Sequence, residues 1–151
     1  MIALTDQPFD PGPLLSDFCR DRTETGAVAT FTGLARAEQG ATATLELEAY
    51  PGFTETEIGR IADGARKRFA LDDFSIVHRV GRVAPGEAIV FVATAAGHRR
   101  AAFEACDFLM DYLKSRAPFW KKETGPDGVA RWVEPRPQDH ADIARWEEPT
   151  P

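Results

Sequence analysis

The sequence has few of the residues on which disulfide frameworks and metal sites depend. It contains two cysteines, Cys19 and Cys106, and three histidines in 151 residues. Two cysteines are too few for a disulfide framework, and their spacing is not that of metal ligands. We therefore expect no metal and no cofactor on this chain. Cys106 falls on the apolar face of a predicted helix, where a buried thiol behaves as a small hydrophobic side chain.

Long apolar runs and an excess of positive charge are also missing. No stretch approaches the roughly 20 apolar residues of a membrane-spanning helix, and the first residues, MIALTDQPFDPG, lack the basic and apolar regions of a signal peptide. The formal net charge of −6 argues against a nucleic-acid-binding protein, which needs a basic face. We expect a cytoplasmic protein that binds neither membranes nor nucleic acids. Any local basic cluster should then serve a small anion.

The hydrophobic pattern predicts strands and helices that alternate irregularly. Strands are expected where β-branched and apolar residues lie between glycine and proline turns, and helices where apolar residues recur every three to four positions. The predicted strands are 26–33, 44–50, 74–80 and 88–95, with a hairpin of 119–123 and 129–134. The predicted helices are 14–21, 54–69, 99–117 and 139–146. Strand 88–95 is apolar on both faces, which predicts a central place in a sheet.

Short turns join several of these strands, which favours an α+β fold over a doubly wound parallel sheet. We expect an α/β-hammerhead-like arrangement: a mixed, mostly antiparallel sheet with flanking helices and a small β subdomain. One domain should span residues 1–146, followed by a disordered tail at 147–151, EEPTP. Segment 34–41 is predicted to be a loop. Thr54 and Glu57 have the spacing of a capping box at a helix start.

The stretch GHRR, residues 97–100, lies at the predicted start of the longest helix. A helix N-terminus carries partial positive charge, so each cation there costs a few tenths to about 1 kcal/mol unless an anion neutralises it. Helix N–H groups, His98 and Arg99 together would form a good phosphate site. Alternatively, Arg99 and Arg100 pair with acidic residues of another segment. The sequence leaves both interpretations open.

A second group of cations follows the same helix, in KSRAPFWKKE at 114–123. Lys114 suits the negative end of the helix dipole and has Asp111 one turn before it, so a solvated lysine is one interpretation. Lys121 and Lys122 are neighbours in a predicted strand, so they point to opposite faces. If Lys114 and Lys121 converge across the turn, each destabilises the charge of the other. One of them would then act as a base or nucleophile.

Arg36 and the aromatic residues beside the lysines allow both functional and structural interpretations. Arg36 follows FTG in a predicted loop, where it either clamps an anion or lies on the surface. Phe119 and Trp120 either wall a site, lowering its effective dielectric, or pack in the core. We interpret His78, in the middle of a predicted strand, as a structural residue.

Several stretches of the chain match a known family. They are GAVATFTGLAR, LEAYPGFTE, HRVGRVAPGEAIVFV, GHRRAAFEACDFLMDYLKSRAPFWKKE and RWVE. In these stretches the chain resembles the large, catalytic subunit of molybdopterin synthase. The resemblance covers nearly the whole chain and is weak only in the N-terminal segment and beyond Glu134.

The resemblance implies a sulfurtransferase that converts cyclic pyranopterin monophosphate (precursor Z) into molybdopterin by installing two sulfurs as a dithiolene. It implies that the sulfur arrives as a thiocarboxylate on the C-terminal Gly-Gly tail of a small ubiquitin-like subunit. It also implies a heterotetramer, with a central dimer of large subunits and a small subunit at each end.

The resemblance assigns residues to the site as well. Lys114 corresponds to the family's essential lysine beside the incoming tail, and Lys121 to its second active-site lysine. Substrate binding would fall to Arg36, His98, Arg99, Lys122, Glu123 and Arg136. Arg136 matches an arginine that reaches the neighbouring subunit's site. Leu34 stands where some members have a lysine, so this loop offers one cation fewer.

A second function stays open at this point: a non-catalytic docking module for the tail of a ubiquitin-like sulfur carrier. The presence of both Lys114 and Lys121, together with His98 and Arg99, argues against it. Single-strand nucleic-acid binding through Phe119 and the lysines is disfavoured by the acidic net charge.

Overall fold

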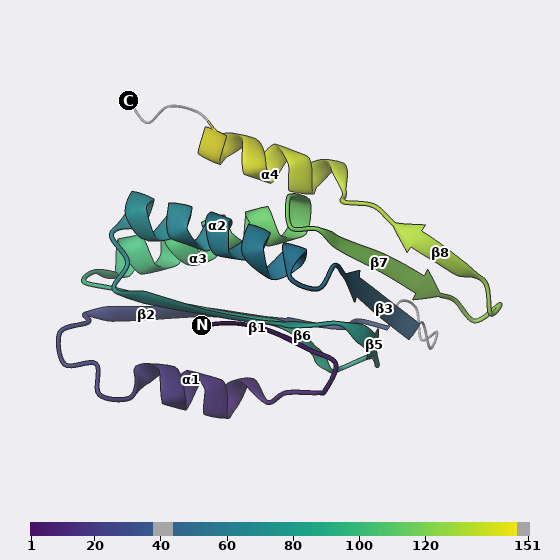
Figure 1. Ribbon diagram of the computed structural model, residues 1–151, viewed down its shortest axis with the longest axis horizontal. Helices are drawn as coiled ribbons and strands as arrows, with labels where there is room; N and C mark the ends of the chain where they lie inside the picture. The colour runs from purple at the N-terminus through teal and green to yellow at the C-terminus, as the bar shows by residue number, and fades with distance from the viewer. Residues whose placement is uncertain (38–43, 148–151) are drawn as a thin grey trace.

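The computed structural model describes residues 1–37 and 44–147, and within them the chain has the α+β fold that the sequence predicts (Figure 1). The strands are β1 (Ile2–Thr5), β2 (Ala27–Leu34), β3 (Thr44–Ala49), β4 (Asp73–Arg79), β5 (Gly81–Val83), β6 (Ala88–Ala96), β7 (Phe119–Thr124) and β8 (Ala130–Val133). The helices are α1 (Pro11–Cys19), α2 (Phe53–Phe69), α3 (Arg99–Ser115) and α4 (Pro137–Glu147). None of these described helices combines the length and apolar character needed to cross a bilayer.

The first sheet has the strand order β1-β4-β6-β2. β1 is parallel to β4, whereas β4 and β2 both run antiparallel to β6, so the sheet is mixed and mostly antiparallel. β6 is central and buried along almost its whole length, which confirms the prediction made from its two apolar faces. In Figure 1, α1 covers one face of this sheet, α2 and α3 cover the other, and α4 lies outermost on the α2–α3 side.

The main core lies between the first sheet and the helices α2 and α3. Both helices bury residues at a spacing of three to four positions, as an amphipathic helix does. These buried residues are Ile58, Ile61, Ala62, Ala65, Ala102, Ala105, Cys106, Phe108, Leu109, Met110 and Leu113. Burial raises the pKa of the Cys106 thiol to about 12. The thiol therefore stays protonated and packs as a small apolar group.

The second sheet has the order β5-β3-β7-β8 and is antiparallel throughout. It is the small β subdomain that the sequence predicts. Ala35, Leu45, Leu47 and Val83 form a separate buried cluster against it. The hairpin of β7 and β8 follows α3 and leads to α4 (Figure 1), so this sheet adjoins the C-terminal end of α3.

Two short strands and one helix start differ from the sequence prediction. β1 and β5 were not predicted, because strands of four and three residues are too short to establish an alternating pattern. β1 is instead fixed by pairing: the Met1 ammonium donates to the Phe74 carbonyl (2.9 Å) beside the parallel β1–β4 ladder. α1 begins at Pro11, three residues early, because the Asp10 carboxylate accepts a hydrogen bond from the Gly12 amide (2.9 Å).

The capping box predicted from Thr54 and Glu57 is wrong. α2 begins earlier, with Gly52 as its N-cap, and the Glu55 carboxylate accepts a hydrogen bond from the Gly52 amide (2.8 Å). Gly52 has φ 82°, in the left-handed region that favours glycine. Thr54 is fully buried and has a different set of partners, which bear on the candidate site.

The C-terminal elements also shift by a few residues. α3 ends at Ser115 rather than 117, and α4 begins at Pro137 rather than 139. Glu147, assigned to the predicted tail, is the last residue of α4, and its carboxylate pairs with Arg116 (2.9 Å). The rest of the predicted tail, 148–151, and residues 38–43, which include half of the predicted loop, lie outside the described residues. The single-domain boundary stays a prediction.

Candidate active site at the C-terminal end of α3

A cleft of about 570 Å³ lies where the C-terminal end of α3 meets the second sheet. Its walls come from the end of β2, from β3, β7 and α3, and from the segment before α4. The volume is in the range of pockets that hold small-molecule ligands. The cations that line the cleft are Arg36, Lys114, Lys121 and Arg136, and its carboxylates are Glu123, Glu134 and Asp139. Four of the eight site residues implied by the resemblance are therefore cations of one cleft.

Lys114 lies in the last turn of α3, exposed at the cleft, with Met110 and Leu113 buried beneath it. Asp111 does not pair with it, although it lies one turn before. The Asp111 carboxylate instead accepts hydrogen bonds from the Arg145 guanidinium (2.7 Å) and from the indole N–H of Trp146 (2.6 Å). Within residues 1–37 and 44–147, Lys114 forms no ion pair. Its charge is thus left for a ligand or for solvent.

The turn between the two lysines is anchored by Thr54. The Thr54 hydroxyl donates to the Pro118 carbonyl (3.1 Å) and accepts from the Tyr50 amide (2.9 Å). Thr54 is fully buried at the start of α2, so the turn that carries the chain from α3 into β7 is fixed to a second helix.

The side chains of β7 point alternately into the cleft and to the outer face of the second sheet. Phe119, Lys121 and Glu123 line the cleft, because alternate residues of a strand share a face. Lys122 points the other way and lies over the Trp132 ring, with its ammonium 5.4 Å from the ring centroid. Trp120 is exposed on the same outer face. The prediction that the two adjacent lysines separate is confirmed, and Lys122 does not line the cleft.

His78 also lines the cleft, a place that the sequence analysis did not predict for it. It is 8% exposed, and its ring stacks on Phe119 with 3.9 Å between centroids. Its Nδ1 lies 2.8 Å from the Arg79 carbonyl oxygen, which can only accept, so Nδ1 carries the proton. Burial lowers the pKa of His78 to about 4, so the ring is neutral near pH 7. Ile76, two residues earlier and therefore on the same face of β4, packs in the α2–α3 core, so the strand pattern indicated only that His78 faces inward.

Arg36 reaches the cleft from the segment after β2. The residue before it, Ala35, is buried and makes two backbone hydrogen bonds to the turn before β6. The Ala35 amide donates to the Glu87 carbonyl (2.9 Å), and the Gly86 amide donates to the Ala35 carbonyl (2.7 Å). Leu34, where some relatives were expected to carry a lysine, lines the cleft with an exposed apolar side chain.

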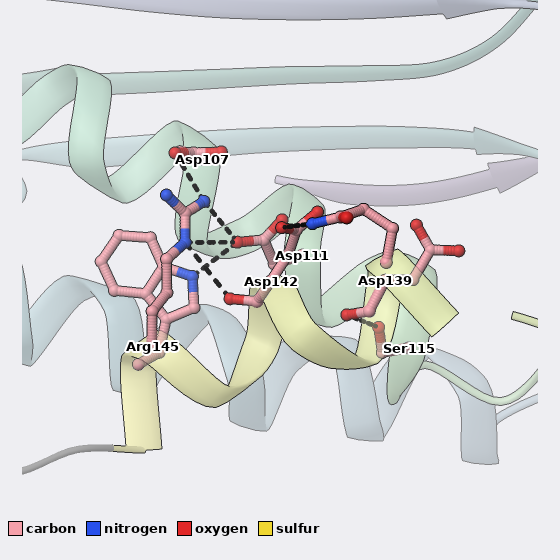
Figure 2. Close-up of polar contacts among 8 residues, drawn as sticks. Asp107, Asp111, Ser115, Asp139, Asp142 and Arg145 are labelled. Carbon is pink, nitrogen blue, oxygen red and sulfur yellow. Dashed lines mark hydrogen bonds and ion pairs between the residues drawn. The ribbon is translucent and has the colours of Figure 1, made fainter. Parts of the chain in front are cut away.

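Arg136 lines the cleft just before α4, and its amide donates to the Asp139 carboxylate (2.8 Å). The Ser115 hydroxyl, at the end of α3, donates to the Asp139 carbonyl (3.0 Å). Figure 2 shows how α4 is held against α3 further along, where Arg145 lies between the Asp107 and Asp111 carboxylates. The position of this wall of the cleft therefore depends on the contact between the two helices.

His98 and Arg99 lie at the opposite end of α3. The helix has 17 residues, so its two ends are about 25 Å apart. His98 is the N-cap, with no side-chain hydrogen bond to the helix, and no acidic residue lies in the first turn. Neither Arg99 nor Arg100 forms an ion pair within the described residues, so the predicted pairing with another segment is not found there. Within one chain, this pair does not join Lys114 in the cleft.

The cleft combines amines and guanidinium groups with an apolar and aromatic lining that includes Phe31, Leu45, Leu47 and Phe119. Cations in such surroundings attract an anionic ligand more strongly than they do in bulk water. Among residues 1–37 and 44–147, no group of three or more His, Cys, Asp or Glu side chains could hold a metal ion. The side chains present can bind an anion, orient it and exchange protons with it.

Comparisons with known proteins cover nearly the whole length of the chain. The family model described as MoaE protein matches residues 4–116. The chain is 70% identical over 148 residues to the molybdopterin synthase catalytic subunit of Caulobacter vibrioides, and the match covers 98% of each sequence. The structure of the molybdopterin biosynthesis MoaE protein from Burkholderia ambifaria superposes with a TM-score of 0.83 at 46% identity, over 99% of both chains. The crystal structure of molybdopterin synthase from Staphylococcus aureus gives 0.77 at 30% identity, over 86% of this chain and 94% of that one.

Proposed function

The chain belongs to the MoaE family, and from that premise we propose that it is the catalytic subunit of a molybdopterin synthase. It is a sulfurtransferase that converts cyclic pyranopterin monophosphate into molybdopterin. The sulfur donor is the thiocarboxylated C-terminus of a small ubiquitin-like subunit, the partner that a catalytic subunit of this kind requires. The full assembly would contain two copies of this chain and two of the small subunit.

One observation carries the proposal: Arg36, Lys114, Lys121 and Arg136 line the same cleft although they come from distant parts of the sequence. Both reactants are anions, one a cyclic phosphate and the other a thiocarboxylate. Guanidinium groups bind phosphate oxygens through charge-assisted hydrogen bonds, and lysine ammonium groups can stabilise a thiocarboxylate and move protons. The composition of the cleft therefore suits both reactants.

We assign Lys114 as the catalytic amine, because it lies at the cleft with its charge uncommitted and its backbone fixed in α3. It would position the thiocarboxylate and take part in proton or acyl transfer. Lys121, on the facing strand, would assist by charge or as the second base. Arg36 would hold the phosphate. Glu123 lines the same wall as Lys121 and would orient its ammonium.

His98 and Arg99 fit the proposal only if a second copy of the chain contributes to the site. They lie about one helix length from Lys114, beyond the reach of any single small substrate. In a dimer of large subunits, the free N-terminus of α3 of one copy could face the cleft of the other. The pair would then hold the phosphate or pterin from the neighbouring copy, and Arg136 would lie near the same boundary.

The test is a reconstituted reaction with purified chain, thiocarboxylated small subunit and cyclic pyranopterin monophosphate. We expect the wild-type chain to form the dithiolene and the Lys114→Ala variant to fail while keeping its fold, because an exposed helix-end lysine adds little stability. Lys67→Ala is a matched control, since Lys67 is an exposed lysine of α2 away from the cleft. A Lys114→Ala chain that turned over at the wild-type rate would refute the assignment.

The alternative of a docking module for the sulfur carrier's tail predicts a different outcome. A docking module would bind the small subunit but leave the pterin unchanged in the same assay, with wild-type chain and all reactants present. The cytoplasmic location and the absence of a cofactor, both expected from the sequence, stay predictions.

A further inference from the structure

Arg79 is a buried cation on the face of β4 opposite His78. Its side chain is 3% exposed, and it lines a separate hollow with Arg82 and Glu87 rather than the cleft. A buried guanidinium is costly unless its N–H groups find acceptors. One terminal nitrogen donates to the Glu87 carboxylate (3.1 Å) and the other to the Arg82 carbonyl (2.6 Å). Arg79 therefore fixes the chain on both sides of the turn between β5 and β6.

The Glu87 carboxylate stabilises that turn through two hydrogen bonds. Besides Arg79, it accepts a hydrogen bond from the Ala84 amide (3.0 Å). The bond from Ala84 and the bond from Arg79 both lower the pKa of Glu87, so its negative charge is held near neutral pH. Gly86 supplies the φ of 89° that the turn needs. The conformation of residues 84–87 thus depends on one ion pair and one glycine.

The same turn holds the segment that delivers Arg36. The Gly86 amide donates to the Ala35 carbonyl, and the Ala35 amide donates to the Glu87 carbonyl. These two backbone hydrogen bonds join the turn to Ala35. Arg36 is the next residue, and its side chain lines the cleft. A continuous series of contacts therefore runs from Arg79 through Glu87 and Ala35 to a cleft cation.

We propose that the Arg79–Glu87 ion pair positions Arg36 for substrate binding, an inference that rests on the proposed function. Neither member of the pair lines the cleft, so neither touches the substrate. The pair holds the turn, the turn holds Ala35, and Ala35 sets where the guanidinium of Arg36 meets the phosphate. Arg79 and Glu87 are positioning residues, distinct from the lysines that handle sulfur.

The first test uses Glu87→Gln and Arg79→Met in the reconstituted reaction. We expect either change to raise KM for cyclic pyranopterin monophosphate about tenfold and to leave kcat within about threefold, since binding rather than chemistry is disturbed. In an Arg36→Ala background the same changes should alter KM less than twofold, because their effect passes through Arg36. Equal effects in both backgrounds would overturn the proposal. Glu87→Gln, at a partly exposed position, keeps the test open if Arg79→Met does not fold.

A matched control removes a comparable ion pair elsewhere. Asp73→Asn removes the ion pairs of Asp73 with Arg22 (2.6 Å) and Arg66 (3.7 Å), at the start of β4 and away from the turn. This variant should leave KM for the pterin unchanged. A tenfold rise of KM in Asp73→Asn would mean that any lost ion pair has this effect, and the specific role of Arg79 would be rejected.

A second test does not depend on turnover. Amide hydrogen exchange in the full chain should show faster exchange at Ala35 in Glu87→Gln than in wild type, while Val92 in β6 stays protected. Unchanged protection at Ala35 would overturn the positioning role whatever the activity. A wild-type chain without activity would instead contradict the proposed function, so the two failures are distinguishable.

Discussion

The two ends of α3 carry similar cations in opposite surroundings. At the N-terminal end, Arg99 and Arg100 are exposed and oppose the helix dipole, and the N-cap residue His98 makes no side-chain hydrogen bond to the helix. At the C-terminal end, Lys114 agrees with the dipole and lies in a cleft that β7 and the segment before α4 help to form. In the isolated chain the arginines at the first end are therefore in an unfavourable position. Lys114, at the second end, already lies in a favourable one.

Under the proposed function, the cations at one end of α3 bind the substrate and the lysine at the other end catalyses. A cation that catalyses must be held in a fixed geometry, and the C-terminal end provides this through Thr54 and through the contact of α4 with Asp111. A cation that only binds a phosphate can lie on an open surface, because the anion itself supplies the missing charge. The comparison leads to four predictions, ordered from the largest expected effect to the smallest.

The kinetic prediction distinguishes the two ends most strongly. Lys114→Ala should lower kcat by about a thousandfold, the range expected for loss of a general acid or base. Arg99→Ala should raise KM for the pterin by about tenfold and change kcat far less, because it removes a binding contact. Steady-state kinetics with saturating small subunit measures both. If the effect of Arg99→Ala fell on kcat instead, the division between binding and catalysis would be lost.

The structural support of the C-terminal end can be broken at Asp111. Asp111→Asn should lower the free energy of unfolding by about 3 kcal/mol, because it removes the charge of a nearly buried carboxylate that accepts hydrogen bonds from both Arg145 and Trp146. Asp107→Asn is the control: it contacts the same arginine (2.7 Å) but is 53% exposed, so its removal should cost less than about 1 kcal/mol. Urea unfolding measures both variants. Equal losses of unfolding free energy in the two variants would show that the different burial of Asp107 and Asp111 does not determine their contributions to stability.

The free energy of unfolding should fall in acid, because the buried His78 becomes protonated. Its folded-state pKa of about 4 lies below its ordinary value of 6.5, so stability is complete above pH 6.5 and falls as pH drops toward 4. The loss should approach roughly 2–3 kcal/mol. His78→Asn keeps a donor for the Arg79 carbonyl but does not titrate, so this part of the acid dependence should vanish. Unfolding free energies measured between pH 7 and 4 give the comparison, and a parallel pH curve for the variant would contradict it.

The smallest effect concerns the helix dipole. Arg99→Glu should stabilise the chain by about 0.5 kcal/mol, because it places a carboxylate at the positive end of α3. Lys114→Glu should destabilise it by a similar amount for the opposite reason. Thermal unfolding at low salt should register shifts of about 1–2 °C in opposite directions. Shifts of the same sign would indicate that contacts other than the dipole dominate at these ends.

The sequence predicted those features that local periodicity determines. Alternation along 119–123 placed Lys121 and Lys122 on opposite faces, and the two apolar faces of 88–95 placed that strand at the centre of the sheet. The length of α3 was also available from the sequence, and at about 1.5 Å per residue it implied that His98 and Lys114 lie far apart. That distance limits the role of His98 in a single chain.

Features that depend on partners distant in sequence could not be predicted. Asp111 looked like the neighbour of Lys114, but its hydrogen-bond donors lie 34 and 35 residues away in α4. His78 looked structural, and its place in the cleft follows from Phe119, which packs on it from another sheet. Periodicity shows which face of an element is buried, and it does not show what lies against that face.

The hydroxyl of Thr54 has a consequence for engineering the protein. It both accepts from the Tyr50 amide and donates to the Pro118 carbonyl, so the spacing between the two amines depends on a residue that does not line the cleft. Serine would keep both bonds, whereas valine, of nearly the same shape, would keep neither. Redesign for a larger or smaller pterin could therefore begin at this residue, leaving every side chain that meets the reactants as it is.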